Sequence, residues 1–230
     1  MAVYHYDQTY MDVARRYNSG NRLCIAVGGD SHGIRLWQQF LESDTRFVFP
    51  NLAIYDDKSF GVSGGLASTY RTHRGSINMC GRNLLQRFNI VVLMIGSNDP
   101  DCFQADGRTC WAITLDIAKI VKDLTNKGKI VYVVAMPTRF TFRRATERDY
   151  RSQNRAINQK LKRILKNRFI ILPPGSYEQS SFARELAGQR YVHLKRQRYA
   201  DLAEKVFRHI DADLRNAASM PSSLPIIYKN

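Results

Sequence analysis

The chain has 230 residues, with 35 lysines and arginines against 20 aspartates and glutamates, and its net charge of +15 predicts attraction to polyanions. Its length suits one domain, and it holds no apolar run near the roughly 18 residues that a membrane-spanning helix needs. A signal peptide and a zinc-type cysteine spacing are not seen either, so we expect a cytoplasmic or otherwise intracellular protein with reduced thiols and no metal site.

Residues 1–21 show no clear period apart from one helical turn, and we predict an N-terminal arm that lies outside the core. The first strong element is the apolar run 23–27, whose length and composition are typical of a buried strand. The run stops at two glycines, an aspartate and Ser31, and apolar residues then recur at helical spacing over 34–41. This pattern predicts a strand that delivers Ser31 to the start of a helix.

Strands and helices alternate along the rest of the chain. Apolar runs predict four more strands, at 47–55, 90–95, 130–136 and 169–172. Helical spacing predicts helices within 66–87, across 113–124 with Gly128 as its cap, and over about 144–166 and 195–214. We therefore predict an α/β fold, a parallel sheet with helices on both faces, which binds ligands beyond the carboxyl ends of its strands.

Three turns at predicted strand ends, and one loop, carry residues suited to acyl transfer. Ser31 would lie among the unpaired backbone N–H groups of a helix start, which favour an oxyanion, although a plain helix cap is the alternative. Gly64 can offer a backbone N–H at close approach, and Asn98 its side-chain amide. His193 is the candidate base because its loop precedes the last helix, whereas His32 adjoins the serine and should point away from it.

The same residues, taken in order, resemble the four sequence blocks of the SGNH (GDSL-like) hydrolase superfamily: Gly29-Asp30-Ser31, Gly64, Asn98 and His193. The resemblance covers about residues 22–214. It implies a flavodoxin-like three-layer α/β/α sandwich with a parallel sheet of about five strands, and hydrolysis of esters, often acetyl esters, without a cofactor. It also implies that Ser31 is the nucleophile, that Ser31, Gly64 and Asn98 form the oxyanion hole, and that His193 is the base.

One position departs from the pattern of this superfamily, which usually has an aspartate three residues before the histidine. Here that position is Arg190, whose charge would oppose a positively charged imidazole at His193. Three outcomes remain open. The pair can act as a dyad steered by a backbone carbonyl or Gln189, an acid such as Glu178 or Glu185 can replace the aspartate, or the site can be inactive.

The segment 139–168 is strongly basic, with eleven lysines and arginines against two acids. Six of these residues follow helical spacing and define a basic stripe, namely Arg144, Arg148, Arg151, Arg155, Lys162 and Lys166. A solvated face is the plain interpretation of the stripe. Because few acids are near to pair with it, the stripe also favours an anionic partner such as nucleic acid or another polyanion.

These observations give two hypotheses. The first is a serine ester hydrolase that acts on a small ester substrate. The alternative is a catalytically degenerate domain of the same fold that binds nucleic acid or another polyanion through the basic stripe, as in a retroelement-encoded protein. For either, we predict an N-terminal arm at 1–21, the hydrolase-like domain at 22–215 and a C-terminal tail at 216–230.

Overall fold

A computed structural model describes residues 8–42, 48–70, 77–101, 109–142, 145–183 and 192–218. The strands are β1 (Leu23–Gly29), β2 (Leu52–Ile54), β3 (Phe60–Gly61), β4 (Ile90–Met94), β5 (Ile130–Val134) and β6 (Phe169–Ile170). The α-helices are α1 (Gln8–Asn18), α2 (Ser31–Glu42), α4 (Ala67–Tyr70), α5 (Arg82–Leu85), α7 (Cys110–Asn126), α8 (Glu147–Leu165) and α9 (Arg196–Ala218). Short 3-10 turns are η1 (Ile77–Met79), η2 (Lys166–Arg168) and η3 (Gln179–Ser181).

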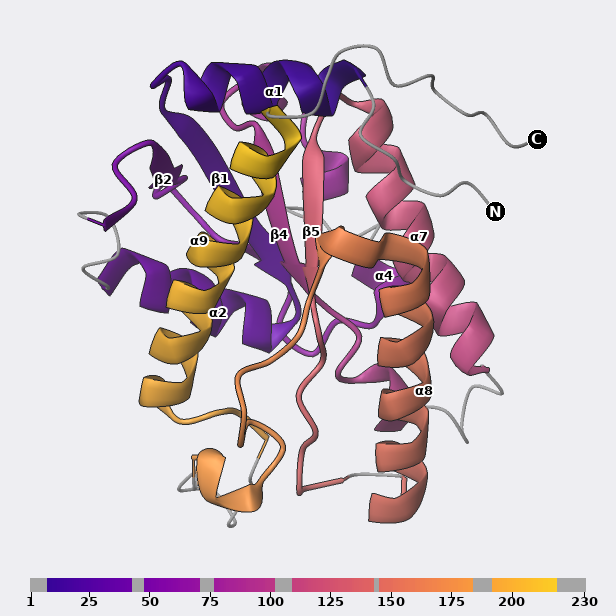
Figure 1. Ribbon diagram of the computed structural model, residues 1–230. Coiled ribbons are helices and arrows are strands. Elements are labelled where there is room, and N and C mark those ends of the chain that lie inside the picture. Colours follow the sequence, from indigo (N-terminus) through magenta and orange to yellow (C-terminus); the bar gives the residue numbers. More distant parts are fainter. Residues whose placement is uncertain are drawn as a thin grey trace.

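The strands form one parallel sheet in the order β2-β1-β4-β5-β6, and β3 pairs with β1. Without the short β3, this is the 2-1-3-4-5 order of flavodoxin-like sheets. Helix α2 packs on α9, and α7 packs on α8. Figure 1 shows these two pairs on either side of the sheet. The predicted three-layer α/β/α sandwich is therefore confirmed.

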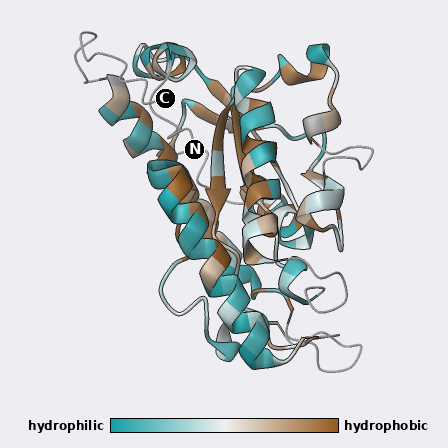
Figure 2. Ribbon diagram, turned by 90° about the vertical axis from the view of Figure 1, so that its right-hand side faces the viewer, coloured by the Kyte–Doolittle hydropathy of each residue, from teal (hydrophilic) through white to brown (hydrophobic). Residues whose placement is uncertain are grey.

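The core follows from the apolar strands and from one apolar face on each helix. Strands β4 and β5 are buried along their whole length. Figure 2 shows these strands in brown between helices whose outward faces are teal. In α7 the buried residues recur at three- and four-residue steps from Ile113 to Leu124, as predicted. Gly128 follows this helix at φ +75°, the left-handed conformation that suits a helix end.

Two segments differ from the prediction. The sequence predicts a turn around Gly64, but the glycine-rich stretch 60–65 that contains it begins with two residues that form β3 beside the end of β1. The helix expected within 66–87 is replaced, where the structure describes this segment, by the short helical pieces α4, η1 and α5. Gly75 and Gly81 disfavour one continuous helix there. None of the described helices is both long and apolar enough to span a membrane.

Helix α1 packs on α9 rather than outside the core. Tyr10, Val13, Ala14 and Tyr17 form its buried face. The expectation that residues 1–21 lie outside the core is therefore wrong for 8–18. The tyrosines bury their rings while their hydroxyls keep hydrogen-bond partners, so a face that looks half polar in the sequence still packs. The division of the chain after residues 21 and 215 stays a prediction.

A buried carboxylate joins α1, the sheet and α9 at this end of the molecule. The Asp213 Oδ2 atom in α9 accepts hydrogen bonds from the hydroxyls of Tyr10 in α1 (2.6 Å) and Tyr132 in β5 (2.8 Å). We call these three residues the Asp213 cluster. Both phenols are fully buried, and burial raises the pKa of Tyr132 well above its usual value, which keeps it a hydrogen-bond donor.

Candidate active site

The end of β1 and the start of α2 place Ser31 at the carboxyl end of the sheet. Gly29 has a φ of +132°, and a Cβ atom there would lie 1.9 Å from the carbonyl oxygen of Met94 in β4, so only glycine fits. Asp30 caps the helix, because its Oδ1 atom accepts a hydrogen bond from the backbone N–H of His32 (2.9 Å). Asp30 rather than Ser31 therefore caps this helix, and the Ser31 hydroxyl has a different partner, described below.

Asp30 also ties the end of β1 to the end of β4. Its side chain is buried, and its Oδ2 atom accepts hydrogen bonds from the Ser97 N–H (3.0 Å) and the Ser97 hydroxyl (2.6 Å). Burial raises the pKa of Asp30, while the hydrogen bonds from Ser97 and the His32 N–H oppose this rise. The turn that carries Asn98 is therefore held against the turn that carries Ser31.

The Ser31 hydroxyl meets His193, which lies 162 residues later in the sequence. The distance from His193 Nε2 to Ser31 Oγ is 2.8 Å, which is a hydrogen bond. Both side chains are half-buried and so can meet a ligand. The loop of His193 is fixed by its backbone, because Ala183 N–H donates to His193 O (2.9 Å) and Phe182 pairs with Leu194.

Asn98 lies beside the loop of Gly64. Its Nδ2 atom donates a hydrogen bond to the Gly65 carbonyl oxygen (3.1 Å), and its Oδ1 atom accepts one from Arg139 Nη1 (3.1 Å). A guanidinium can only donate, so Arg139 fixes the amide oxygen on its own side and turns the nitrogen toward the Gly64 loop. The amide nitrogen carries two N–H groups, and Gly65 engages one of them. Gly64 itself is exposed and has a φ of +72°.

Arg139 was counted in the basic segment, but the structure buries it. Only 6% of its surface is exposed, its Nη2 atom pairs with Asp101 Oδ2 at 2.5 Å, and its guanidinium lies 5.2 Å from the centre of the Tyr150 ring. It is thus a support for Asn98 rather than a surface charge. The one signal in the sequence is its position, two residues after the proline that ends a predicted strand.

His32 is a second residue whose place the sequence did not give. It is fully buried, its Nδ1 atom is 2.7 Å from the Tyr199 hydroxyl, and its ring centre is 5.1 Å from that of His193. Burial lowers the pKa of His32 well below its usual value, and the electrostatic interactions with the His193 ring and the Arg139 guanidinium lower it further. His32 is therefore neutral at pH 7.

This neutral imidazole predicts a loss of stability in acid. Below about pH 6.5 the unfolded chain protonates His32 but the folded chain does not. Each unit by which the pH is lowered therefore reduces the free energy of unfolding by up to about 1.4 kcal/mol through this group. A His32→Asn variant keeps an amide near Tyr199 and removes the titration. Urea unfolding at about pH 7.5, 6.5 and 5.5 should show a shallower dependence for the variant; an unchanged slope would contradict this prediction.

Some of the predicted residues lie outside the part of the chain that the structure describes. Arg190 is one of them, as are Glu185 and Gln189. Glu178 is described, and its exposed carboxylate accepts a hydrogen bond from Ser180 rather than from His193. The expected effect of Arg190, a charge that opposes a positively charged imidazole at His193, therefore stays a prediction.

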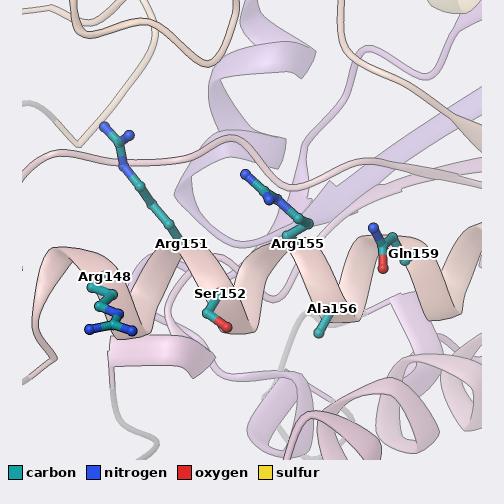
Figure 3. A pocket seen from close by; sticks show the side chains of 6 residues that line it. All are labelled: Arg148, Arg151, Ser152, Arg155, Ala156 and Gln159. Atoms are coloured by element: carbon teal, nitrogen blue, oxygen red, sulfur yellow. The ribbon is translucent and has the colours of Figure 1, made fainter.

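The basic stripe follows the exposed side of α8 with two exceptions: Lys166 lies just past the end of this helix, in η2, and Arg144 is outside the residues that the structure describes. The five described residues of the stripe are all exposed, and Tyr150, Ile157 and Leu161 are buried on the opposite face. Arg151 pairs with Glu147 at 2.6 Å. Figure 3 shows Arg151 and Arg155 on one side of the helix and Arg148 on the other, so the stripe is broader than a single row.

Comparisons with known proteins bear on the fold. No family model matches the sequence, and no curated protein matches it. A carbohydrate esterase of family 3 from Talaromyces cellulolyticus is similar in structure, with a TM-score of 0.57 and 14% identity over 84% of this chain and 99% of that one. An acetyl xylan esterase from Geobacillus stearothermophilus has a TM-score of 0.56 and 14% identity over 83% of this chain and 95% of that one.

A third similar structure comes from Desulfitobacterium hafniense and is assigned to the G-D-S-L lipolytic family. Its TM-score is 0.53, with 12% identity over 82% of this chain and 99% of that one. At these identities the likeness concerns the fold alone. The chain has the fold of the SGNH (GDSL-like) hydrolases, as its sequence motifs predicted.

Proposed function

We propose that this protein is a serine ester hydrolase in which Ser31 is the nucleophile and His193 is the base. The observation that carries the proposal is the 2.8 Å contact between His193 Nε2 and Ser31 Oγ at the carboxyl end of the sheet. The fold that it shares with carbohydrate and acetyl xylan esterases supports an ester, and an acetyl ester in particular, as the substrate.

In the proposed reaction, His193 Nε2 takes the hydroxyl proton as Ser31 Oγ attacks the ester carbonyl carbon. The N–H groups of Ser31 and Gly64 and the amide of Asn98 stabilise the resulting oxyanion, each by about 3 kcal/mol. His193 then gives the proton to the leaving alkoxide, and an acyl-enzyme remains on Ser31. A water molecule deprotonated by His193 releases the acid and restores the serine. Protein groups supply every step, so the proposed cycle needs no cofactor.

A fluorophosphonate probe tests this function directly, because it labels a serine only when a base activates it. We expect the wild-type protein to be labelled, with the modified peptide containing Ser31 by mass spectrometry. We also expect it to hydrolyse p-nitrophenyl acetate. A folded wild-type protein that takes no label and hydrolyses no acetate ester would contradict the proposal.

Arg139 should affect catalysis through Asn98. Arg139→Lys keeps a cation for Asp101 but loses the second donor to the Asn98 amide. We expect kcat to fall by about 10- to 100-fold with little change in KM, because a slightly misplaced oxyanion donor mainly affects the transition state. In an Asn98→Ala background the same substitution should change kcat less than threefold. Equal effects in both backgrounds would show that Arg139 does not act through Asn98.

The alternative, a catalytically degenerate domain that binds nucleic acid or another polyanion, stays a prediction. A degenerate site has no need for a hydrogen bond between Ser31 and His193, so the geometry favours the hydrolase. Binding of nucleic acid that weakens steeply with salt, in a protein that takes no fluorophosphonate label, would favour the alternative.

A further inference from the structure

A groove of about 420 Å³ lies between α8 and the ends of β5 and β6, strands of the same parallel sheet that carries Ser31 at the end of β1. One of its sides is formed by α8. The other is formed by residues at and just beyond the carboxyl ends of β5 and β6, among them Thr138 and Ile171. Nothing in the proposed hydrolysis of a small ester uses this groove.

The groove is positively charged. Arg151, Arg155 and Lys162 line it from α8, and none of its lining residues is acidic. Glu147 neutralises Arg151, but Arg155 and Lys162 form no ion pair with any residue that the structure describes. A second hollow on α8 is lined by Arg148 as well as Arg151 and Arg155, as Figure 3 shows, and it extends the positive surface around the helix. Cations gathered without acids concentrate anions at a surface.

The groove also exposes apolar surface. Ile171 is 50% exposed and Tyr177 is 44% exposed, and both line it. Large apolar side chains that remain exposed next to cations suit a ligand with flat or apolar faces between its charges. A bare inorganic ion would make no use of Ile171 or Tyr177.

The groove continues the edge of the sheet on which the proposed catalytic residues lie. Thr138 lines the groove, and the next residue, Arg139, holds Asn98. Neighbouring strands are about 4.8 Å apart, and β5 and β6 lie two and three places from β1, so their ends are displaced across the sheet by about 10 and 14 Å from the strand end that carries Ser31. A short ester at Ser31 would not reach it, but a chain of a few units would.

We propose that this groove binds the anionic part of an extended ester substrate, so that the preferred substrates are esters on oligomers that carry carboxylate or phosphate groups. The proposal rests on the proposed hydrolase function and narrows its substrate class. The ester lies at Ser31, and the neighbouring units run past Asn98 so that their charges meet Arg155 and Lys162.

The test uses the double variant Arg155→Glu/Lys162→Glu and, as a matched control, Arg163→Glu. Arg163 is exposed on the same helix but does not line the groove. Three substrates are compared: acetylated oligogalacturonate, which carries carboxylates, an acetylated xylo-oligosaccharide of the same length, which is neutral, and p-nitrophenyl acetate, which is too short to reach.

For the double variant we expect kcat/KM on the acidic oligomer to fall by about 10-fold or more, mostly through KM, because the reversed charges repel the ligand. Its kcat/KM on the two neutral esters should stay within about twofold of wild type, as should all three values for the control variant. An equal fall on all three esters, no change on the acidic one, or the same fall in the control variant would overturn the proposal.

Direct binding separates failure of the groove from failure of the hydrolase. If no ester is cleaved, the proposed function fails. Fluorescence anisotropy with a labelled oligogalacturonate then tests whether the groove binds an anionic oligomer. A dissociation constant raised by about 10-fold or more in the double variant supports an anion site. The same variant is tested with a labelled oligothymidylate. Loss of oligothymidylate binding without any effect on the acidic sugar would overturn the substrate proposal and assign the groove to nucleic acid.

Discussion

Replacing Ser31 with alanine is expected to reduce kcat for p-nitrophenyl acetate by about 10⁴-fold or more and to abolish fluorophosphonate labelling. The variant keeps the fold but lacks the oxygen that His193 Nε2 contacts at 2.8 Å. Without that oxygen no acyl-enzyme can form, and only the oxyanion donors remain to assist a water molecule. Initial rates over a range of substrate concentrations, with label incorporation measured on the same samples, give both results.

Two further variants sharpen the Ser31→Ala result. Ser152→Ala removes an exposed serine of α8 and should leave rate and labelling unchanged. His193→Ala should lower kcat to a similar extent as Ser31→Ala. The double variant Ser31→Ala/His193→Ala should have a kcat no lower than either single variant, because a nucleophile and its base act as a unit. Effects that multiply in the double variant would show that the two residues do not work together, whatever their distance.

Asp213→Ala is expected to lower the free energy of unfolding by about 3 to 5 kcal/mol. The substitution removes the acceptor of two hydrogen bonds at once, those from the buried hydroxyls of Tyr10 and Tyr132. A buried donor that loses its acceptor costs about 1 to 3 kcal/mol, and the lost side chain leaves a small cavity. Urea unfolding followed by far-ultraviolet circular dichroism measures the loss.

The matched control for Asp213 is Glu204→Ala on the same helix. Glu204 pairs with Arg208 on the surface of α9 at 2.6 Å, and exposed pairs contribute less than about 1 kcal/mol. A loss below about 1 kcal/mol for Asp213→Ala would contradict the role given to the Asp213 cluster. At temperatures where the variant stays folded, it should keep its ester hydrolysis, because the cluster lies near the amino ends of the strands.

The sequence predicted the sheet well because its central strands carry an unambiguous signal. Runs such as 90–95 and 130–136 are apolar throughout and rich in β-branched residues, which is typical of a strand buried on both faces. Their ends then had to meet at one edge of a parallel sheet, so Ser31 and Asn98 could be placed near each other before any contact was known. The pairing of His193 with Ser31 followed from the family motif rather than from periodicity.

The supporting residues could not be found in this way. The burial of Arg139 depends on Asp101, 38 positions away, and on the Tyr150 ring, so nothing local distinguishes it from a surface arginine. His32 is buried because α9 brings Tyr199 over it, a contact across 167 positions. Contacts at such separations are set by how whole elements pack, which a local pattern does not encode.

The strand order has a consequence for how this protein can change. The bonds of Asp30 fasten the Ser31 turn to the Asn98 turn at the ends of β1 and β4, whereas the groove lies on α8 and the ends of β5 and β6. The proposed nucleophile and the proposed substrate groove thus lie at the ends of different strands of one sheet. Substitutions at exposed groove positions of α8, such as 155 and 162, can change which molecules are accepted, whereas Tyr150 on the buried face of the same helix contacts Arg139 and must be kept. The exposed face of α8 is therefore the natural place to redesign specificity.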